Sequence, residues 1–329
     1  MKEILARWEA ACAPSAILRF VDVNLRGVGQ VMFQDSPLTG LLFLAAVAWG
    51  SIAAGAPSIF FGGLLGLVAA TLAGVWLKVD EATLKAGLCG YNGVLVGLAL
   101  PTFLAPGLLL WVYVVVGGAV STIVTLGAAN TLKPFEAPAL TFPFVIVTWI
   151  LLLASYGFAG LPGAALPSGQ VVAPFEPAAS LALGAGAFLA GVLKSISQVF
   201  LKASAVSALL MLAGLVVNSV AAAAFALGGA ILAVITAHLF GAETDLVSQG
   251  LLGFSPVLTA IALGATFHRP SPRIAAYAAL GVVFTVVAQA ALNVALRPFA
   301  IPALTAPFVL VSWMFLLPPR RFGEGAETQ

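Results

Sequence analysis

PALTFPFVIVTW at residues 138–149 recurs as PALTAPFVLVSW at residues 302–313, with nine of the twelve aligned positions identical. The flanks agree as well, because Leu-Lys-Pro-Phe at 132–135 is matched by Leu-Arg-Pro-Phe at 296–299. A match of this length at a constant offset of 164 residues indicates that the chain contains two copies of one structural unit.

Two weaker matches occur in the same order along the chain. LCGYNGVLVGLAL from residue 88 aligns with LLGFSPVLTAIAL from residue 251. Near the start of each copy, Gln30, Val31 and Ser36 align with Gln198, Val199 and Ser204. The chain therefore divides into a first half at residues 1–165 and a second half at residues 170–329, joined by the Gly- and Pro-rich stretch GLPGAALPSGQ.

The composition predicts an all-α integral membrane protein. Of the 329 residues 61% are hydrophobic and 8% are charged, whereas about a quarter of the residues of a soluble domain are charged. The net charge of +2 comes without basic runs, which argues against a nucleic-acid partner. Cys12 and Cys89 lack metal-ligand spacing, so we expect neither a disulfide framework nor a metal site. The stretch before Pro14 has no apolar core of signal-peptide length, and we expect no cleaved segment.

The lengths of the apolar segments predict the topology. A helix needs about 20 apolar residues to cross a hydrocarbon core. Segments 88–101 and 251–264 fall short of that length and are expected to be re-entrant half-helices. We therefore predict ten transmembrane helices plus two re-entrant half-helices, the ten crossings lying at residues 15–33, 38–55, 58–77, 107–129 and 139–157 and at residues 178–200, 203–221, 224–240, 273–294 and 303–318.

An odd number of crossings in each half makes the two halves inverted repeats, an arrangement that surrounds a central site in many transporters. The even total puts both termini on one side of the membrane. Lys2 and Arg7 at one end, with Arg320 and Arg321 at the other, place that side in the cytoplasm by the positive-inside rule. We expect a multi-pass protein of a bacterial-type inner membrane, in contact with membrane lipid.

The duplicated threonines are the first candidates for a binding site. A proline follows two residues after Thr141 and again two residues after Thr305, so regular helical hydrogen bonding fails at both places. The freed carbonyls beside a hydroxyl suit a solute rich in N–H donors. A proline that merely kinks a helix is the alternative for a single copy, but the duplication favours a pore.

Side chains near the repeated motifs complete the predicted pore. Gln30 and Gln198 hold matching positions, and a carboxamide both accepts from an NH2 group and donates to a carbonyl. Phe33, Tyr91 and Phe254 are candidates for flat walls that admit only thin, planar solutes. Taken singly, aromatic residues in membrane helices more often pack or face lipid, and an interfacial glutamine often faces headgroups.

The ionisable residues do not form a symmetric ion site. The acidic residues gather at predicted helix ends, and Glu136 is matched by Ala300. His238 and His268 both lie in the second half. No nucleophile with an adjacent base is visible, so an enzyme is not expected. Two alternatives stay open: a proton-coupled carrier for small amides or amines that uses Glu136 or His238, and an ammonium or water channel. A receptor or scaffold is disfavoured because this chain has no sizeable soluble region.

The residues quoted above resemble the urea transporter family over essentially the whole chain, with the doubled Leu-Thr-x-Pro-Phe as the most specific motif. The resemblance implies a homotrimer in which each subunit conducts urea passively, down its gradient and without a cofactor. Carried over by position, Thr141 and Thr305 resemble the residues of the narrow centre, and Gln30 and Gln198 those of the two outer sites. The slot-lining positions of the family correspond here to Phe33, Tyr91, Val31, Val199 and Phe254.

Three positions depart from the family pattern. Tyr91 stands where phenylalanine is expected, so its hydroxyl adds a hydrogen bond or narrows one mouth. Leu201 lies opposite Phe33 in the alignment and makes one wall aliphatic. Gln198 is neutral where some relatives carry an acid. These departures leave the preference among urea, methylated ureas and other small amides undetermined.

Overall fold

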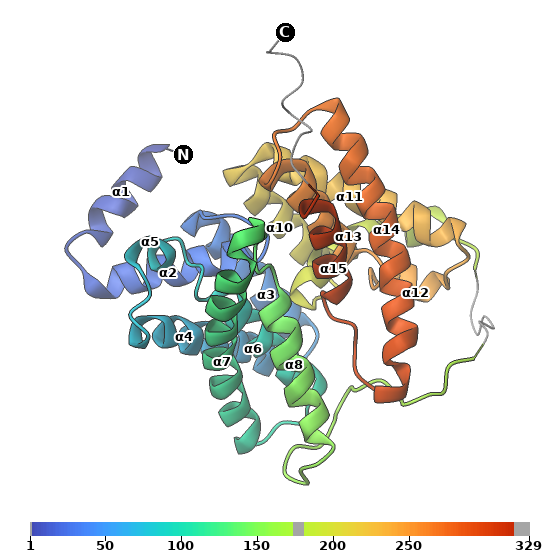
Figure 1. The fold of residues 1–329 in the computed structure, drawn as a ribbon, viewed down its shortest axis with the longest axis horizontal. Helices are drawn as coiled ribbons and strands as arrows, with labels where there is room; N and C mark the ends of the chain where they lie inside the picture. Colours follow the sequence, from blue (N-terminus) through green and yellow to red (C-terminus); the bar gives the residue numbers. More distant parts are fainter. Residues whose placement is uncertain (1, 174–180, 319–329) are drawn as a thin grey trace.

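The computed structural model describes residues 2–173 and 181–318. Within them every regular element is a helix, apart from an isolated bridge between Leu104 and Gly163. Figure 1 shows the helices of the first half, blue to green, gathered beside those of the second half, yellow to red, with α8 and α15 near the middle. The prediction of an all-α chain is confirmed.

The first half contains eight α-helices and one 3-10 turn: α1 (Lys2–Cys12), α2 (Ala16–Gln30), α3 (Pro37–Ala53), α4 (Pro57–Trp76), α5 (Glu81–Lys85), α6 (Tyr91–Phe103), α7 (Leu108–Leu132), η1 (Lys133–Phe135) and α8 (Phe142–Ser155).

The described part of the second half repeats this order without a counterpart of α1. Its elements are α9 (Ala185–Ser197), η2 (Gln198–Phe200), α10 (Ala205–Asn218), α11 (Val220–Leu239), α12 (Thr244–Ser248), α13 (Phe254–Ile261), the π-turn η3 (Ala262–Thr266), α14 (Pro272–Leu296), η4 (Arg297–Phe299) and α15 (Ala306–Leu316).

Four helices of the described residues are long and apolar enough to cross a bilayer: Pro57–Trp76, Leu108–Phe135, Val220–Leu239 and Pro272–Phe299. The pair Ala185–Phe200 and Ala205–Asn218 passes the same criterion together but bends by 71° at its break. The other predicted crossings are helices of 11 to 17 residues, shorter than predicted. Helix length by itself therefore does not establish ten crossings, and the predicted segment 178–200 begins outside the described residues.

The predicted crossings at 139–157 and 303–318 are short because their first residues are not helical. Leu140 and Leu304 have left-handed backbone, with φ of 51° and 52°. Thr141 and Thr305 then precede the first turns of α8 and α15, where Pro143 and Pro307 lie. Proline is tolerated in a first turn because the missing N–H has no acceptor there. The prolines start these helices rather than kinking them.

Aligned positions of the two halves have the same backbone conformation elsewhere too. Phe33 and its counterpart Leu201 have φ of 62° and 56°. Gly87 and Gly250 have φ of 76° and 74°. A Cβ on Gly87 would lie 2.3 Å from the nitrogen of Gly27, so this turn depends on glycine. These turns direct the chain from one helix to the next around the site described below.

Contacts between the halves come in reciprocal pairs. Thr39 on α3 donates to the carbonyl of Gly214 on α10 at 2.8 Å. At the aligned positions, Ser207 on α10 donates to the carbonyl of Ala46 on α3 at 2.7 Å. Such pairs arise when two similar units meet across a local two-fold axis.

The indole groups of α8 and α15 make a second reciprocal pair. Trp149 donates to the carbonyl of Pro302 at 2.9 Å, and Trp313 donates to the carbonyl of Pro138 at 2.8 Å. Each tryptophan thereby holds the turn that precedes the opposite helix, which fixes the two threonine-containing turns relative to each other.

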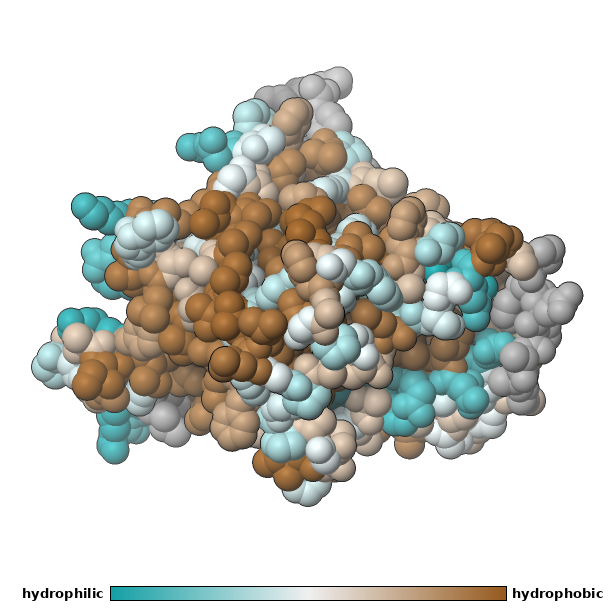
Figure 2. Space-filling view, turned by 90° about the horizontal axis from the view of Figure 1, so that it is seen from below, coloured by the Kyte–Doolittle hydropathy of each residue, from teal (hydrophilic) through white to brown (hydrophobic). Residues whose placement is uncertain are grey.

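The molecular surface is apolar over a wide area. Figure 2 shows brown, hydrophobic residues covering much of one face. Trp76, Leu108 and Leu239 are each about three-quarters exposed or more. An exposed apolar surface of this extent is characteristic of a protein whose solvent is lipid, so the chain is a multi-pass membrane protein.

The two cysteines are not joined to each other. Cys12 and Cys89 are both buried and free. Arg320 and Arg321, on which half of the orientation argument depends, lie outside the described residues.

Candidate functional site

Two cavities lie on opposite sides of one hydrogen bond. The first cavity has a volume of about 550 Å³ and is lined mainly by α2, α6, α7 and the turn before α8. The second cavity, of about 860 Å³, is lined mainly by η2, α13, α14 and the turn before α15. Thr141 lines the first and Thr305 the second, and their hydroxyls share a hydrogen bond of 2.6 Å.

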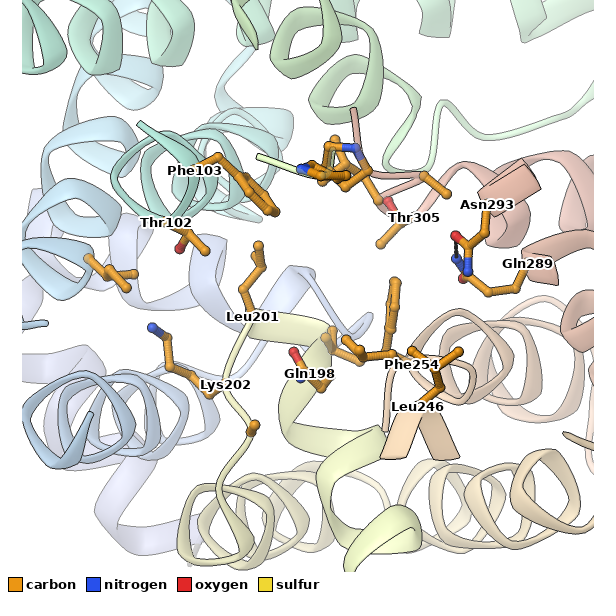
Figure 3. Close-up of a pocket in the computed structure, with 18 of the residues that line it drawn as sticks. Thr102, Phe103, Gln198, Leu201, Lys202, Leu246, Phe254, Gln289, Asn293 and Thr305 are labelled. Carbon is orange, nitrogen blue, oxygen red and sulfur yellow. Dashed lines mark hydrogen bonds between the residues drawn. The ribbon is translucent and has the colours of Figure 1, made fainter. Parts of the chain in front are cut away.

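All nine residues predicted for the site line these cavities. Five of them border the first cavity, namely Gln30, Val31, Phe33, Tyr91 and Thr141. The other four border the second cavity, namely Gln198, Val199, Phe254 and Thr305. Figure 3 shows Gln198, Leu201, Phe254 and Thr305 around a common space in the second cavity.

The threonine pair lies between the two cavities. Each threonine is 3% exposed, so little water reaches either hydroxyl. Their separation of 164 positions equals the offset of the repeated motif. A hydroxyl carries one donor and two acceptor lone pairs, so each threonine keeps acceptor capacity while it bonds the other.

The two glutamines are fixed in the same way. The side-chain nitrogen of Gln30 donates to the carbonyl of Ala86 at 2.8 Å, and that of Gln198 donates to the carbonyl of Gln249 at 3.0 Å. Within the described part of the chain, neither side-chain oxygen receives a hydrogen bond from protein. Each cavity therefore contains a carboxamide oxygen that can accept from a solute, while one N–H of each amide is already engaged.

The Tyr91 hydroxyl makes the two cavities unequal. It donates to the carbonyl of Leu140 at 2.7 Å, directly beside Thr141. The aligned residue of the second half is Phe254, which has no hydroxyl, and Leu304 there lines the second cavity. The hydroxyl adds a hydrogen bond, one of the two effects expected from this departure, and it occupies an acceptor that its counterpart leaves available.

Aromatic side chains that the sequence analysis missed form the walls. The ring of Phe33 packs edge-on against Phe267 at 5.6 Å and Phe308 at 6.1 Å. The corresponding residues of the second cavity are Leu201, Phe103 and Phe144. Phe144 and Phe308 follow the motif prolines in both copies, so the repeat itself contained the signal.

Each half contains a buried hydrogen-bonded pair of polar side chains, one an amide and the other a hydroxyl. The helices that carry the amide and the hydroxyl are exchanged between the halves. In the first half, Asn92 on α6 donates to Thr125 on α7 at 3.0 Å. In the second half, Ser255 on α13 donates to Gln289 on α14 at 2.8 Å. The amide lies on the short helix in one half and on the long helix in the other, and both pairs satisfy buried polar groups.

The Asn92 side chain also fixes the helix that carries the first threonine. Its oxygen accepts from the backbone N–H of Phe144 at 3.2 Å. This N–H belongs to the first turn of α8 and has no acceptor inside its own helix. Asn92 thus connects α6, α7 and the N-terminus of α8 at the level of Thr141.

Charged residues are distributed differently around the two cavities. The first cavity is bordered by Asp80 and Lys133. The backbone N–H of Thr83 donates to Asp80 and lowers the pKa of that exposed carboxyl. The second cavity is bordered by Lys202 and Arg297, and none of its described lining residues is acidic.

The residues considered for a proton-coupled carrier lie elsewhere. Glu136 and His238 are exposed, and neither borders either cavity. In the described ranges, no three His, Cys, Asp or Glu residues are grouped so as to hold a metal ion.

Comparisons with known proteins extend over nearly the whole chain. A family model described as "UT: Urea transporter" matches residues 21–320. Urea transporter 1 of Ovis aries is 26% identical over 306 residues, which are 91% of this chain and 77% of that protein. Urea transporter 1 of Rattus norvegicus is 25% identical over 311 residues, which are 92% of this chain and 77% of that protein. The matched region contains every residue of the two cavities named above.

Proposed function

The chain belongs to the urea transporter family, and from this we propose that urea passes through the first cavity, between Thr141 and Thr305, and into the second cavity. The protein is a passive transporter of urea and not an enzyme. The observation that carries the proposed route is that two cavities, each large enough to hold urea, meet at a duplicated pair of threonines.

Dehydration is the barrier that such a route must lower. Urea is neutral, flat and rich in N–H donors, and a buried polar group without a hydrogen-bond partner costs several kcal/mol. The acceptors along the route are the side-chain oxygens of Gln30 and Gln198 and the hydroxyls of Thr141 and Thr305. Several weak sites in line allow release as well as binding.

In this proposal the central step of the mechanism is the breaking and re-forming of the hydrogen bond between the two threonines. A urea molecule that reaches Thr141 replaces the bond between the two threonines with bonds from its own NH2 groups to their oxygens. When urea leaves, the hydroxyls pair again, so neither stays unsatisfied in a buried position. Phe33, Phe267 and Phe308 on one side keep the solute flat against the wall. Val31 and Val199 contribute apolar surface beside the glutamines.

We also propose the finer topology that the sequence predicts. The halves at 1–165 and 170–329 are inverted repeats, each with five crossings and one re-entrant helix. The reciprocal contacts between α3 and α10 support this arrangement. Helix α6 has 13 residues, about 20 Å of helix, and is too short to span. In this proposal both termini are cytoplasmic, the membrane is a bacterial-type inner membrane, and three subunits with separate pores form a homotrimer.

The test of the route is urea flux in proteoliposomes, followed by stopped-flow light scattering. Thr141→Val and Thr305→Val together are expected to lower urea flux by about tenfold or more, because two polar contacts become apolar. Thr131→Val is the matched control, since Thr131 is exposed on α7 and its hydroxyl donates to the carbonyl of Gly127 in its own helix. Unchanged flux in the double variant would remove the threonines from the route.

The same vesicles separate the alternatives. A proton-coupled carrier predicts flux that collapses when the pH gradient is removed, whereas passive transport predicts no change. An ammonium or water channel predicts a different pattern. Relative to protein-free vesicles, the protein would then increase the permeation of ammonia or water more than it increases the permeation of urea.

A further inference from the structure

Lys202 is a buried amine with no partner among the described residues. It lies between η2 and α10 and is 4% exposed. Its side-chain nitrogen makes no hydrogen bond or ion pair with any residue of the described ranges, although Lys202 lines the second cavity. Figure 3 shows it on the far side of Leu201 from Gln198, with its nitrogen toward the side on which Thr102 lies.

The aligned residue of the first half, Gln34, has hydrogen-bond partners in the protein at both polar atoms of its side chain. Gln34 is 2% exposed. Its side-chain nitrogen donates to the carbonyl of Met32 at 2.8 Å, and its oxygen accepts from Asn218 on α10 at 2.9 Å. At this position, therefore, the amide side chain of Gln34 is hydrogen-bonded to a second amide, that of Asn218 in the opposite half.

The second half has no such pair, because the residue aligned with Asn218 is Gly50 on α3. A Cβ on Gly50 would lie 3.1 Å from the Lys202 Cδ and 3.2 Å from its Cβ. The lysine stem thus occupies the space that a side chain at position 50 would need. The glycine accommodates the stem and offers no polar partner, so the amine continues into the cavity.

The surroundings of the amine favour negative charge. Arg297 also lines this cavity, so a second positive charge borders it. Among the described residues around this cavity none is acidic.

We propose that Lys202 binds a small monovalent anion in the second cavity. An unpaired buried ammonium is unfavourable, and one negative charge beside it supplies the missing partner. This inference does not depend on the proposed urea route.

The experiment measures the melting temperature of the full-length protein in detergent. Sodium formate or sodium chloride replaces sodium gluconate at constant ionic strength. The wild-type protein is expected to show a saturable rise in melting temperature with formate or chloride, because a ligand of the folded state stabilises it. Lys202→Gln is expected to weaken the apparent affinity by about tenfold or more, and Lys202→Arg to retain it. Lys85→Gln, which removes an exposed lysine paired with Glu81, is expected to respond like the wild type.

A second variant keeps the test informative if Lys202→Gln folds poorly. Gly50→Asn combined with Lys202→Gln recreates the amide pair of the first half and is expected to fold and to be insensitive to the anion. The proposal is wrong if the wild-type melting temperature does not depend on the anion. It is also wrong if Lys202→Gln or the double variant shows the same rise as the wild type.

Discussion

The hydroxyl oxygens of Thr141 and Thr305 lie 2.6 Å apart, although the two residues are 164 positions apart in the chain. Each threonine directly precedes the first turn of its helix and follows a leucine with left-handed backbone. The two halves therefore place the same residue of the same turn at one point, where it meets its own counterpart. A change at either threonine consequently alters the surroundings of the other.

The threonine pair should show strong energetic coupling. Thr141→Val leaves the Thr305 hydroxyl buried without its partner, which costs about 1–3 kcal/mol of the free energy of unfolding. The double valine variant removes both hydroxyls, so its loss should be smaller than the sum of the single losses. A double-mutant cycle on unfolding in detergent measures this coupling, and strictly additive losses would contradict the hydrogen bond.

The glutamine oxygens should contribute equally to urea flux. Gln30→Leu and Gln198→Leu each remove one acceptor of the route, and each should lower urea flux about five- to tenfold. Gln170→Leu is the control, because Gln170 is exposed and its side chain bonds Ser168. Flux that is normal in both site variants would mean that urea does not use these oxygens.

Removing the Tyr91 hydroxyl should make the first cavity resemble the second. Tyr91→Phe leaves the Leu140 carbonyl with only the long 3.5 Å hydrogen bond from Asn92 and makes it available to the solute, so urea flux should rise about twofold while stability falls by about 1 kcal/mol. Tyr156→Phe is a matched control, because Tyr156 donates to the Ala300 carbonyl at an exposed position. Phe254→Tyr should have the opposite effect on flux. A fall in flux for Tyr91→Phe would indicate that urea bonds the hydroxyl itself.

Two glycines with similar backbone should tolerate alanine very differently. Gly55 has φ of 67°, and no atom lies within 4 Å of the position that a Cβ would take. Gly55→Ala should therefore lower the free energy of unfolding only by the strain of alanine in a left-handed conformation, about 1–2 kcal/mol. Gly87→Ala adds a contact of 2.3 Å with the nitrogen of Gly27 and should cost about 1–3 kcal/mol more. It should also lower urea flux, because Ala86 holds the Gln30 side chain. Equal melting temperatures for the two variants would contradict this packing.

The aligned motifs identified residues that lie together in space, whereas the predicted bounds of their helices were wrong. All nine residues chosen from the motifs line the two cavities. The predicted segments at 139–157 and 303–318 nevertheless include residues that are not helical. Left-handed backbone at a leucine has no signature in composition, since glycine or asparagine is the usual residue in that conformation.

The partners of the predicted residues were not predictable from the motifs. Gln30 bonds Ala86 and Tyr91 bonds Leu140, which are 56 and 49 positions away. Phe267, from the opposite half, packs on Phe33. Periodicity describes which face of an element is apolar, but it does not specify which distant carbonyl or ring lies opposite a given side chain.

The sequence by itself determined that the chain is a membrane protein of two similar halves, because hydropathy and a near-identical repeat are properties of the residue order alone. Only the tertiary structure decided that the two threonines touch, that the amides of Gln30 and Gln198 donate to backbone carbonyls, and that Lys202 lacks, among the described residues, the kind of partner that Gln34 has. These facts depend on distances between residues far apart in the chain. Such distances are fixed by helix packing and by the turns between helices, and alignment of the two copies does not contain them.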